Sequence, residues 1–197
     1  TDSYECANSE NLSRFSTIDA DTFGCDIMMF HPNRHVARIM FKKALEELGS
    51  PGWYQDSALY AFPIRMAMKL DIKLVVYGED VNYTYGGKFD EETPSALYQP
   101  LNDAIKPVWD IWFKDGQLRK QDLECTKLPD VKEVKEYGLE PIYLSYFVPW
   151  NSYHNYEVAK KYGFRHLSHE YQREGSVDDY DQIDSLGYLM NPYLKYL

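Results

Sequence analysis

"IKLVVYGED", residues 72–80, is a β-rich apolar run that ends in a glycine and two acids. A run of this kind is typical of a strand that is buried in a parallel sheet and opens into a functional loop. Two other stretches share the pattern, "CDIMMFH" at 25–31 and "PIYLSYFVPW" at 141–150. We therefore expect three buried strands, each followed by a polar loop.

Helical patterns separate these strands. Residues 35–50 have the apolar and charged periodicity of an amphipathic helix, with Gly49 as its C-terminal stop. Asn151 is expected to cap another helix, which ends at Gly163. The remaining predicted helices cover 57–70, bent or restarted at Pro63, 96–113 around Pro107, and 130–137. Alternating strands and helices predict one α/β domain over 1–197, with an open parallel sheet covered by helices on both faces.

Composition narrows the classes of function. The 197 residues carry 21 basic and 31 acidic side chains, a net charge of −10, which argues against a broad nucleic-acid surface. The three cysteines are far apart and form no CxxC pair, so neither a disulfide framework nor a zinc knuckle is expected. No apolar run is long enough to span a membrane, and the first residues lack the pattern of a signal peptide. We expect a cytoplasmic protein without membrane insertion.

Ligands of open α/β sheets bind beyond the carboxyl ends of the strands, which directs attention to the loop after residue 78. Glu79 and Asp80 follow the strand directly, and Gly86 and Gly87 allow a backbone to approach a ligand closely. Two adjacent carboxylates there suit a magnesium ion that carries phosphates, or the orientation of polar substrate groups. A solvated turn is the alternative reading, and spacing alone leaves both open.

A second acidic stretch, "REGSVDDYDQIDSLGY" at 173–188, lies near the end of the sequence. Its acidic residues alternate with an arginine, a glutamine and tyrosines. A surface that is only solvated has no need of these residues, so the mixture favours a functional site. An exposed loop at the start of a helix is the alternative, because acidic side chains favour helix N-termini. The members of interest are Arg173, Glu174, Asp178, Asp179, Tyr180, Asp181, Gln182 and Asp184.

Three motifs give the chain a resemblance to a known family. "LVVYGEDVNYTYGG" at 74–87, "PIYLSYFVPWNSYHNYEVAKKYGF" at 141–164 and "REGSVDDYDQIDSLGYLMNPYLKY" at 173–196 together resemble the N-acetyl sugar amidotransferases. These enzymes act in the assembly of bacterial surface glycans such as lipopolysaccharide and O-antigen. They are grouped with the PP-loop ATPases of the adenine nucleotide α-hydrolase-like superfamily. The resemblance implies a Rossmann-like α/β fold and an ATP- and Mg²⁺-dependent conversion of a sugar acetamido group into an acetamidino group.

The resemblance also implies roles for individual residues. Glu79, Asp80, Asp179 and Asp181 would be catalytic, with Mg²⁺ at the first two, and the segment of about 165–197 would form the substrate side. The substrate-binding residues would be Asn82, Tyr85, Gly86, Gly87, Tyr146, Trp150, Asn155, Arg173, Glu174, Asp178, Tyr180, Gln182 and Asp184. They would bind a nucleotide-linked N-acetyl sugar.

The sequence departs from the family in two ways. The SGGxDS loop, which cradles pyrophosphate in PP-loop enzymes, is absent, so we expect this chain to be a fragment or the ordered part of a larger amidotransferase. The cysteines offer no glutaminase triad and no zinc site, so by resemblance a separate glutaminase and a cyclase-like subunit would supply ammonia. The oligomeric state, including a homo-oligomer, stays open.

The sequence is also compatible with two rival functions. One is a non-catalytic homologue that lacks the loop and binds a nucleotide-sugar or scaffolds the glutaminase. The other is a different PP-loop reaction, such as tRNA thiolation, which the acidic charge balance disfavours.

Overall fold

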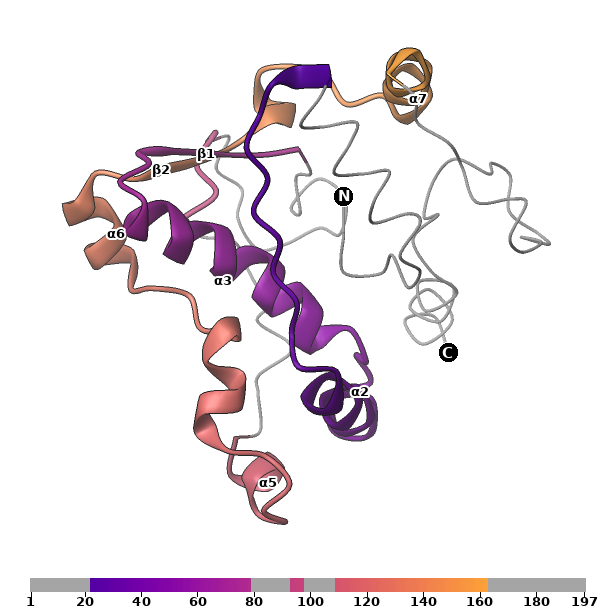
Figure 1. Cartoon of the computed structure of the whole chain (residues 1–197), viewed down its shortest axis with the longest axis vertical. Helices are drawn as coiled ribbons and strands as arrows, with labels where there is room; N and C mark the ends of the chain where they lie inside the picture. The colour runs from indigo at the N-terminus through magenta and orange to yellow at the C-terminus, as the bar shows by residue number, and fades with distance from the viewer. Residues whose placement is uncertain (1–21, 79–92, 98–108, 163–197) are drawn as a thin grey trace. The chain divides into compact units, whose positions relative to one another are not determined.

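The computed structural model describes residues 22–78, 93–97 and 109–162 (Figure 1). The chain divides into two compact units, one that covers Pro32–Pro149 and one that contains residues 22–31 and 150–162. The prediction of a single domain over 1–197 stays a prediction.

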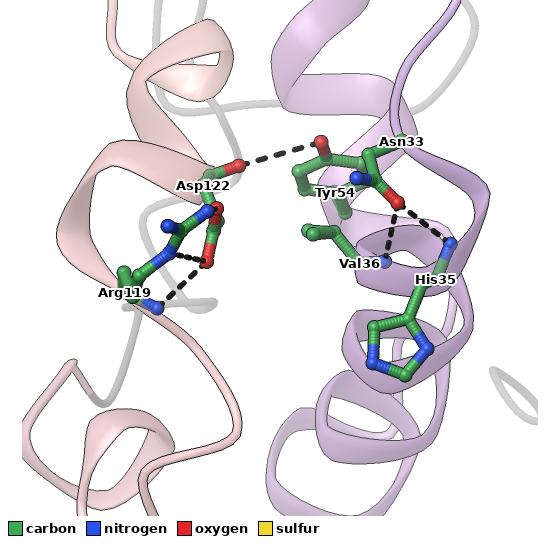
Figure 2. Close-up of polar contacts among 6 residues, drawn as sticks. All are labelled: Asn33, His35, Val36, Tyr54, Arg119 and Asp122. Atoms are coloured by element: carbon green, nitrogen blue, oxygen red, sulfur yellow. Dashed lines mark hydrogen bonds and ion pairs between the residues drawn. The ribbon is translucent and has the colours of Figure 1, made fainter.

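Helix α2, Arg34–Leu48, confirms the amphipathic helix expected from the sequence. The side chain of Asn33 caps its start by accepting from the backbone N–H groups of His35 at 2.9 Å and Val36 at 3.4 Å (Figure 2). Gly49 ends it in the left-handed conformation, with φ of +64°. Gly49 is the stop that the sequence predicts, whereas the cap at Asn33 was not predicted.

Helix α3, Trp53–Lys69, is longer than the predicted helix and runs through Pro63 without a restart. The sequence predicted a bend or a restart at this proline, and of the two the restart does not occur. Proline removes one helical N–H group, but its fixed φ is compatible with a helix. Burial on both sides of the proline, at Ala61 and Ile64, holds the two halves in one element.

The first part of the core lies between α2, α3 and the 3₁₀ segment η2, Lys120–Thr126. Trp53 and Trp112 meet there with ring centroids 4.8 Å apart, in an edge-on arrangement. The hydroxyl of Tyr54 donates to the backbone carbonyl of Asp122 at 3.5 Å, which links α3 to η2 (Figure 2). The buried residues of this cluster are Val36, Met40, Ala44, Trp53, Tyr54, Trp112, Leu118 and Leu123.

Strands β1, Leu74–Tyr77, and β2, Glu140–Tyr143, pair in parallel as a two-stranded sheet. The connection between them contains α5, Trp109–Phe113, then η2, and then α6, Val131–Tyr137. A helical crossover between parallel neighbours is what alternating strands and helices predict. The described part of the chain is thus mixed α/β with a small parallel sheet.

The register of the sheet gives its two faces different surroundings. Leu74 pairs with Glu140 and Tyr77 with Tyr143. Val75 packs with Ile64, Ala67, Val134 and Leu139 in a second core cluster between the sheet, α3 and α6. Leu74 and Val76, which point to the other face, are 51% and 49% exposed.

Residues 94–96 add a short antiparallel contact to the sheet. Ser95 is bridged to Ile142, the N–H of Ala96 donates to the carbonyl of Pro141, and the N–H of Tyr143 donates to that of Pro94, both at 2.8 Å. The predicted helix at 96–113 was wrong at its beginning, because residues 96 and 97 are not helical. In the described residues that helix is limited to α5, and Pro107 lies outside them.

The second unit contains an apolar segment that the sequence analysis took for a buried strand. Residues 25–31 form no strand, and Ile27, Met28 and Met29 are 40%, 50% and 45% exposed. The prediction was wrong because an apolar run becomes a strand only when a neighbouring strand satisfies its backbone groups. Within the described residues no such neighbour pairs with it.

Helix α7, Ser152–Lys161, also belongs to the second unit. Asn151 caps it as predicted, accepting from the N–H of His154 at 2.8 Å. Its C-cap is Tyr162, and Gly163 lies outside the described residues. None of the helices in the described ranges combines the length and apolar composition that a membrane crossing requires.

Candidate functional site

The two parallel strands end side by side, and this edge is the candidate site. Tyr77 at the end of β1 is paired in register with Tyr143 at the end of β2. Gly78 continues β1 toward Glu79, and the 3₁₀ segment η3, Leu144–Tyr146, continues β2. Ligands of α/β proteins bind beyond such carboxyl ends, since the loops that leave parallel strands gather there.

Tyr77 is part of the framework of this edge. Its hydroxyl donates to the backbone carbonyl of Tyr60 at 3.1 Å, and its ring lies 5.9 Å from that of Tyr60 and 6.3 Å from that of Tyr143. Burial raises the pKa of Tyr77 above its ordinary value, because a phenolate would lose its hydration there. Tyr77 is therefore a neutral donor that ties β1 to α3.

The turn after β2 presents two large rings to solvent. The N–H groups of Phe147 and Val148 both donate to the carbonyl of Leu144, at 2.9 and 3.0 Å. The rings of Tyr146 and Phe147 lie 5.2 Å apart at an angle of 74°, and the two residues are 51% and 59% exposed. The predicted strand over 141–150 was wrong beyond Tyr143, because the chain turns there and loses its ladder with β1.

Short-range hydroxyl contacts fix the segment that flanks β2. The hydroxyl of Thr93 accepts from the N–H of Ser95, and the hydroxyl of Ser95 accepts from the N–H of Leu97, both at 3.3 Å. These bonds hold residues 93–97 in a turn beside β2. Sequence reasoning placed 93–95 in a polar loop and did not find this pairing.

Only three of the predicted site residues fall within the described ranges. Tyr146 lies in the 3₁₀ segment η3 that follows β2 at the carboxyl edge of the sheet, and its substrate-binding role stays a prediction. Trp150, 48% exposed, and Asn155, exposed on α7, belong to the other unit. Those outside the described residues are Glu79, Asp80, Asn82, Tyr85, Gly86, Gly87, Arg173, Glu174, Asp178, Asp179, Tyr180, Asp181, Gln182 and Asp184.

Phe147 is an exposed residue of the candidate edge that sequence reasoning did not single out. It stands next to Tyr146 in "SYFVPW", which the apolar pattern assigned to a buried strand. A strand would have turned Tyr146 and Phe147 to opposite faces. The signal available in the sequence was the proline two residues later, which is unfavourable in a central strand.

Residues 22–78, 93–97 and 109–162 also contain metal-ligating side chains and two free cysteines, Cys25 and Cys125. No three His, Cys, Asp or Glu side chains in those ranges lie close enough together to hold a metal ion. Cys125 is half-buried and its thiol contacts the hydroxyl of Tyr54 at 3.3 Å. Burial raises the pKa of the Cys125 thiol, which makes it a poor nucleophile near neutral pH.

No family model matches the chain, and a search of curated proteins finds no significant match. The likeness to the N-acetyl sugar amidotransferases therefore rests on the three motifs in the sequence itself.

Proposed function

We propose that the chain belongs to an ATP-dependent amidotransferase that converts the acetamido group of a nucleotide-linked N-acetyl sugar into an acetamidino group. The proposal places the reaction in bacterial surface-glycan assembly in the cytoplasm, with ammonia supplied by a separate glutaminase and a cyclase-like subunit. The fold that goes with it is an open Rossmann-like sheet, of which β1 and β2 would be two neighbouring strands.

The observation that carries the proposal is the shared carboxyl edge of β1 and β2. Tyr77 and Gly78 lead directly into Glu79 and Asp80, while the adjacent strand leads into Tyr146. Loops from two neighbouring parallel strands start at this edge, which is the usual location of a ligand site in α/β proteins. Two motifs of the resemblance, 74–87 and 141–164, begin with these strands.

The reaction explains why acids and rings would both be needed. An amide oxygen is a poor leaving group, so it attacks the α-phosphorus of ATP and pyrophosphate departs. Ammonia then adds to the activated carbon, and AMP leaves with the former amide oxygen. Carboxylates would hold Mg²⁺ and the nitrogen as it becomes cationic, while aromatic rings would hold the sugar. The described part of the edge supplies rings, which suit the sugar rather than the metal.

The test is AMP release by the full-length gene product, given ATP, Mg²⁺, ammonium and a panel of nucleotide-linked N-acetyl sugars. Mass spectrometry of the sugar runs in parallel. AMP together with the small mass decrease that accompanies replacement of oxygen by NH is the expected result. AMP without that mass change would contradict the amidine assignment.

The rival functions give different results in the same assay. A non-catalytic homologue binds a sugar in calorimetry and releases no AMP under any condition. A tRNA-modifying enzyme releases AMP only when tRNA is added. Either result would overturn the proposal.

A further inference from the structure

Tyr146 and Phe147 form an exposed aromatic pair at the carboxyl edge, and of the two only Tyr146 belongs to the predicted site. Large aromatic rings in a folded protein are normally buried or half-buried, because each buried ring contributes substantially to stability. Leu144 and Val148 beside them are also exposed, by 44% and 56%. An apolar group of this size at the edge where ligands bind indicates a contact surface.

We propose that Phe147 forms a stacking surface, together with Tyr146, for the sugar ring of the nucleotide-linked substrate. The inference rests on the proposed function and adds a specificity-determining residue to the same site. It concerns the sugar ring and not the acetamido chemistry.

The geometry of the pair favours a sugar over a flat base. The two rings stand at 74° to one another, so they form a corner with one ring face on each side. A base is best held against one ring face or between two parallel rings. A pyranose ring carries C–H groups on its faces and along its rim, and these groups make apolar contact with both rings of the corner.

The turn that carries the pair is fixed by its backbone. Phe147 and Val148 both donate to the carbonyl of Leu144, directly after β2 is anchored to β1 and to residues 94–96. A ring held by such a turn loses little conformational freedom when a ligand stacks on it. The backbone that carries Phe147 is therefore set before a ligand arrives.

The experiment compares sugar binding by Phe147→Ala and by the wild type, in the full-length protein, using isothermal calorimetry. UDP-N-acetylglucosamine is the first probe, followed by the other nucleotide-linked N-acetyl sugars of the panel and by UDP alone. The matched control is Leu70→Ala, since Leu70 is 52% exposed and lies at the C-cap of α3, before the amino end of β1. Phe147→Trp keeps an aromatic face.

We expect Phe147→Ala to weaken binding of the sugar-linked probe by roughly tenfold, the effect of losing one stacking ring. Leu70→Ala should bind like the wild type, and Phe147→Trp should keep most of the affinity. Binding of UDP alone should not change, because the uridine and phosphates do not touch the corner.

Three results would overturn the inference. The first is unchanged sugar affinity in Phe147→Ala, especially if its melting temperature falls, since the ring would then pack within the protein. The second is an equal loss for UDP alone, which would assign the ring to the base. The third is a wild type that binds no member of the panel. The AMP assay on the wild type tells failure of this inference from failure of the proposed function. If the wild type releases AMP and Phe147→Ala binds the sugar as tightly as the wild type, only the role of Phe147 is refuted.

Discussion

Replacing Tyr77 with phenylalanine tests the edge on which the site is built. The change removes the hydroxyl that donates to the carbonyl of Tyr60 at 3.1 Å. It keeps the ring, which lies 5.9 Å from the ring of Tyr60 and 6.3 Å from that of Tyr143. Tyr77→Phe therefore isolates one hydrogen bond between β1 and α3.

The loss follows from the character of this bond. A bond from a neutral hydroxyl to a backbone carbonyl contributes about 1 kcal/mol to the free energy of unfolding. For a chain of this size, that corresponds to a melting temperature lower by about 2–4 °C. The packing of the ring is unchanged, so no cavity adds to the cost.

The pH dependence gives a second, independent signature. The pKa of Tyr77 is raised in the folded protein, so folding favours its protonated form. That contribution to stability is complete below the pKa of an unfolded tyrosine, about 10, and it is lost as the pH rises toward the folded value. In this range the wild type loses up to about 1.4 kcal/mol per pH unit through Tyr77, and Tyr77→Phe loses none of it. The stability gap should narrow above pH 10 or so.

The assay is thermal unfolding of both proteins, followed by circular dichroism at several pH values between neutral and strongly alkaline. Tyr146→Phe is the control, because Tyr146 is 51% exposed and its change should leave the melting temperature unaltered. Equal melting temperatures of Tyr77→Phe and wild type at neutral pH, with parallel alkaline profiles, would refute the bond between β1 and α3.

Three further predictions concern the same unit. Ser57→Ala should raise the free energy of unfolding by about 1 kcal/mol in urea titrations, because the Ser57 hydroxyl is buried without a hydrogen-bond partner in the described chain; an equal decrease would show a bond in solution. Gly49→Ala should lower the free energy of unfolding by about 1 kcal/mol in the same titration, because Gly49 has φ of +64°, which alanine adopts only with strain. No atom lies within 4 Å of an added Cβ, so a steric clash does not contribute. An equal decrease for Gly49→Asn would argue against backbone strain as the cause, since asparagine tolerates this conformation better. Lys43→Met should make the stability of the protein depend less on pH in acid. The Nζ of Lys43 lies 2.5 Å from a carboxylate oxygen of Asp115 and lowers the pKa of Asp115, so this ion pair stabilises the fold above the ordinary carboxyl pKa and ceases to do so as the pH falls. Identical curves of unfolding free energy against acid pH for Lys43→Met and wild type would contradict the prediction.

The ends of the helices depend mainly on residues that are close together in the sequence. Helix α2 begins at the cap of Asn33 and ends at Gly49, and helix α7 begins at the cap of Asn151. Each of these residues bonds to backbone groups a few positions away. Because a cap and its partner are close in the chain, the sequence contains the whole interaction. Pro63 was harder to judge, since burial along α3 overrides a local preference for a break.

The strands and the site depended on distant contacts. The run at 72–80 contains a strand that pairs in parallel as predicted, whereas the run at 25–31 is no strand. The candidate edge could be located from the end of a predicted strand, but the place of Phe147 depended on where β2 stops.

The sequence by itself determined that 35–50, 130–137 and the residues after Asn151 are largely helical and that 72–80 contains a strand of a parallel sheet. Only the tertiary structure decided how long each strand is, that residues 94–96 pair with β2, and that Tyr146 and Phe147 stand together in solvent. The physical reason is that a helix satisfies its backbone within itself, whereas a strand exists only as far as a partner accompanies it.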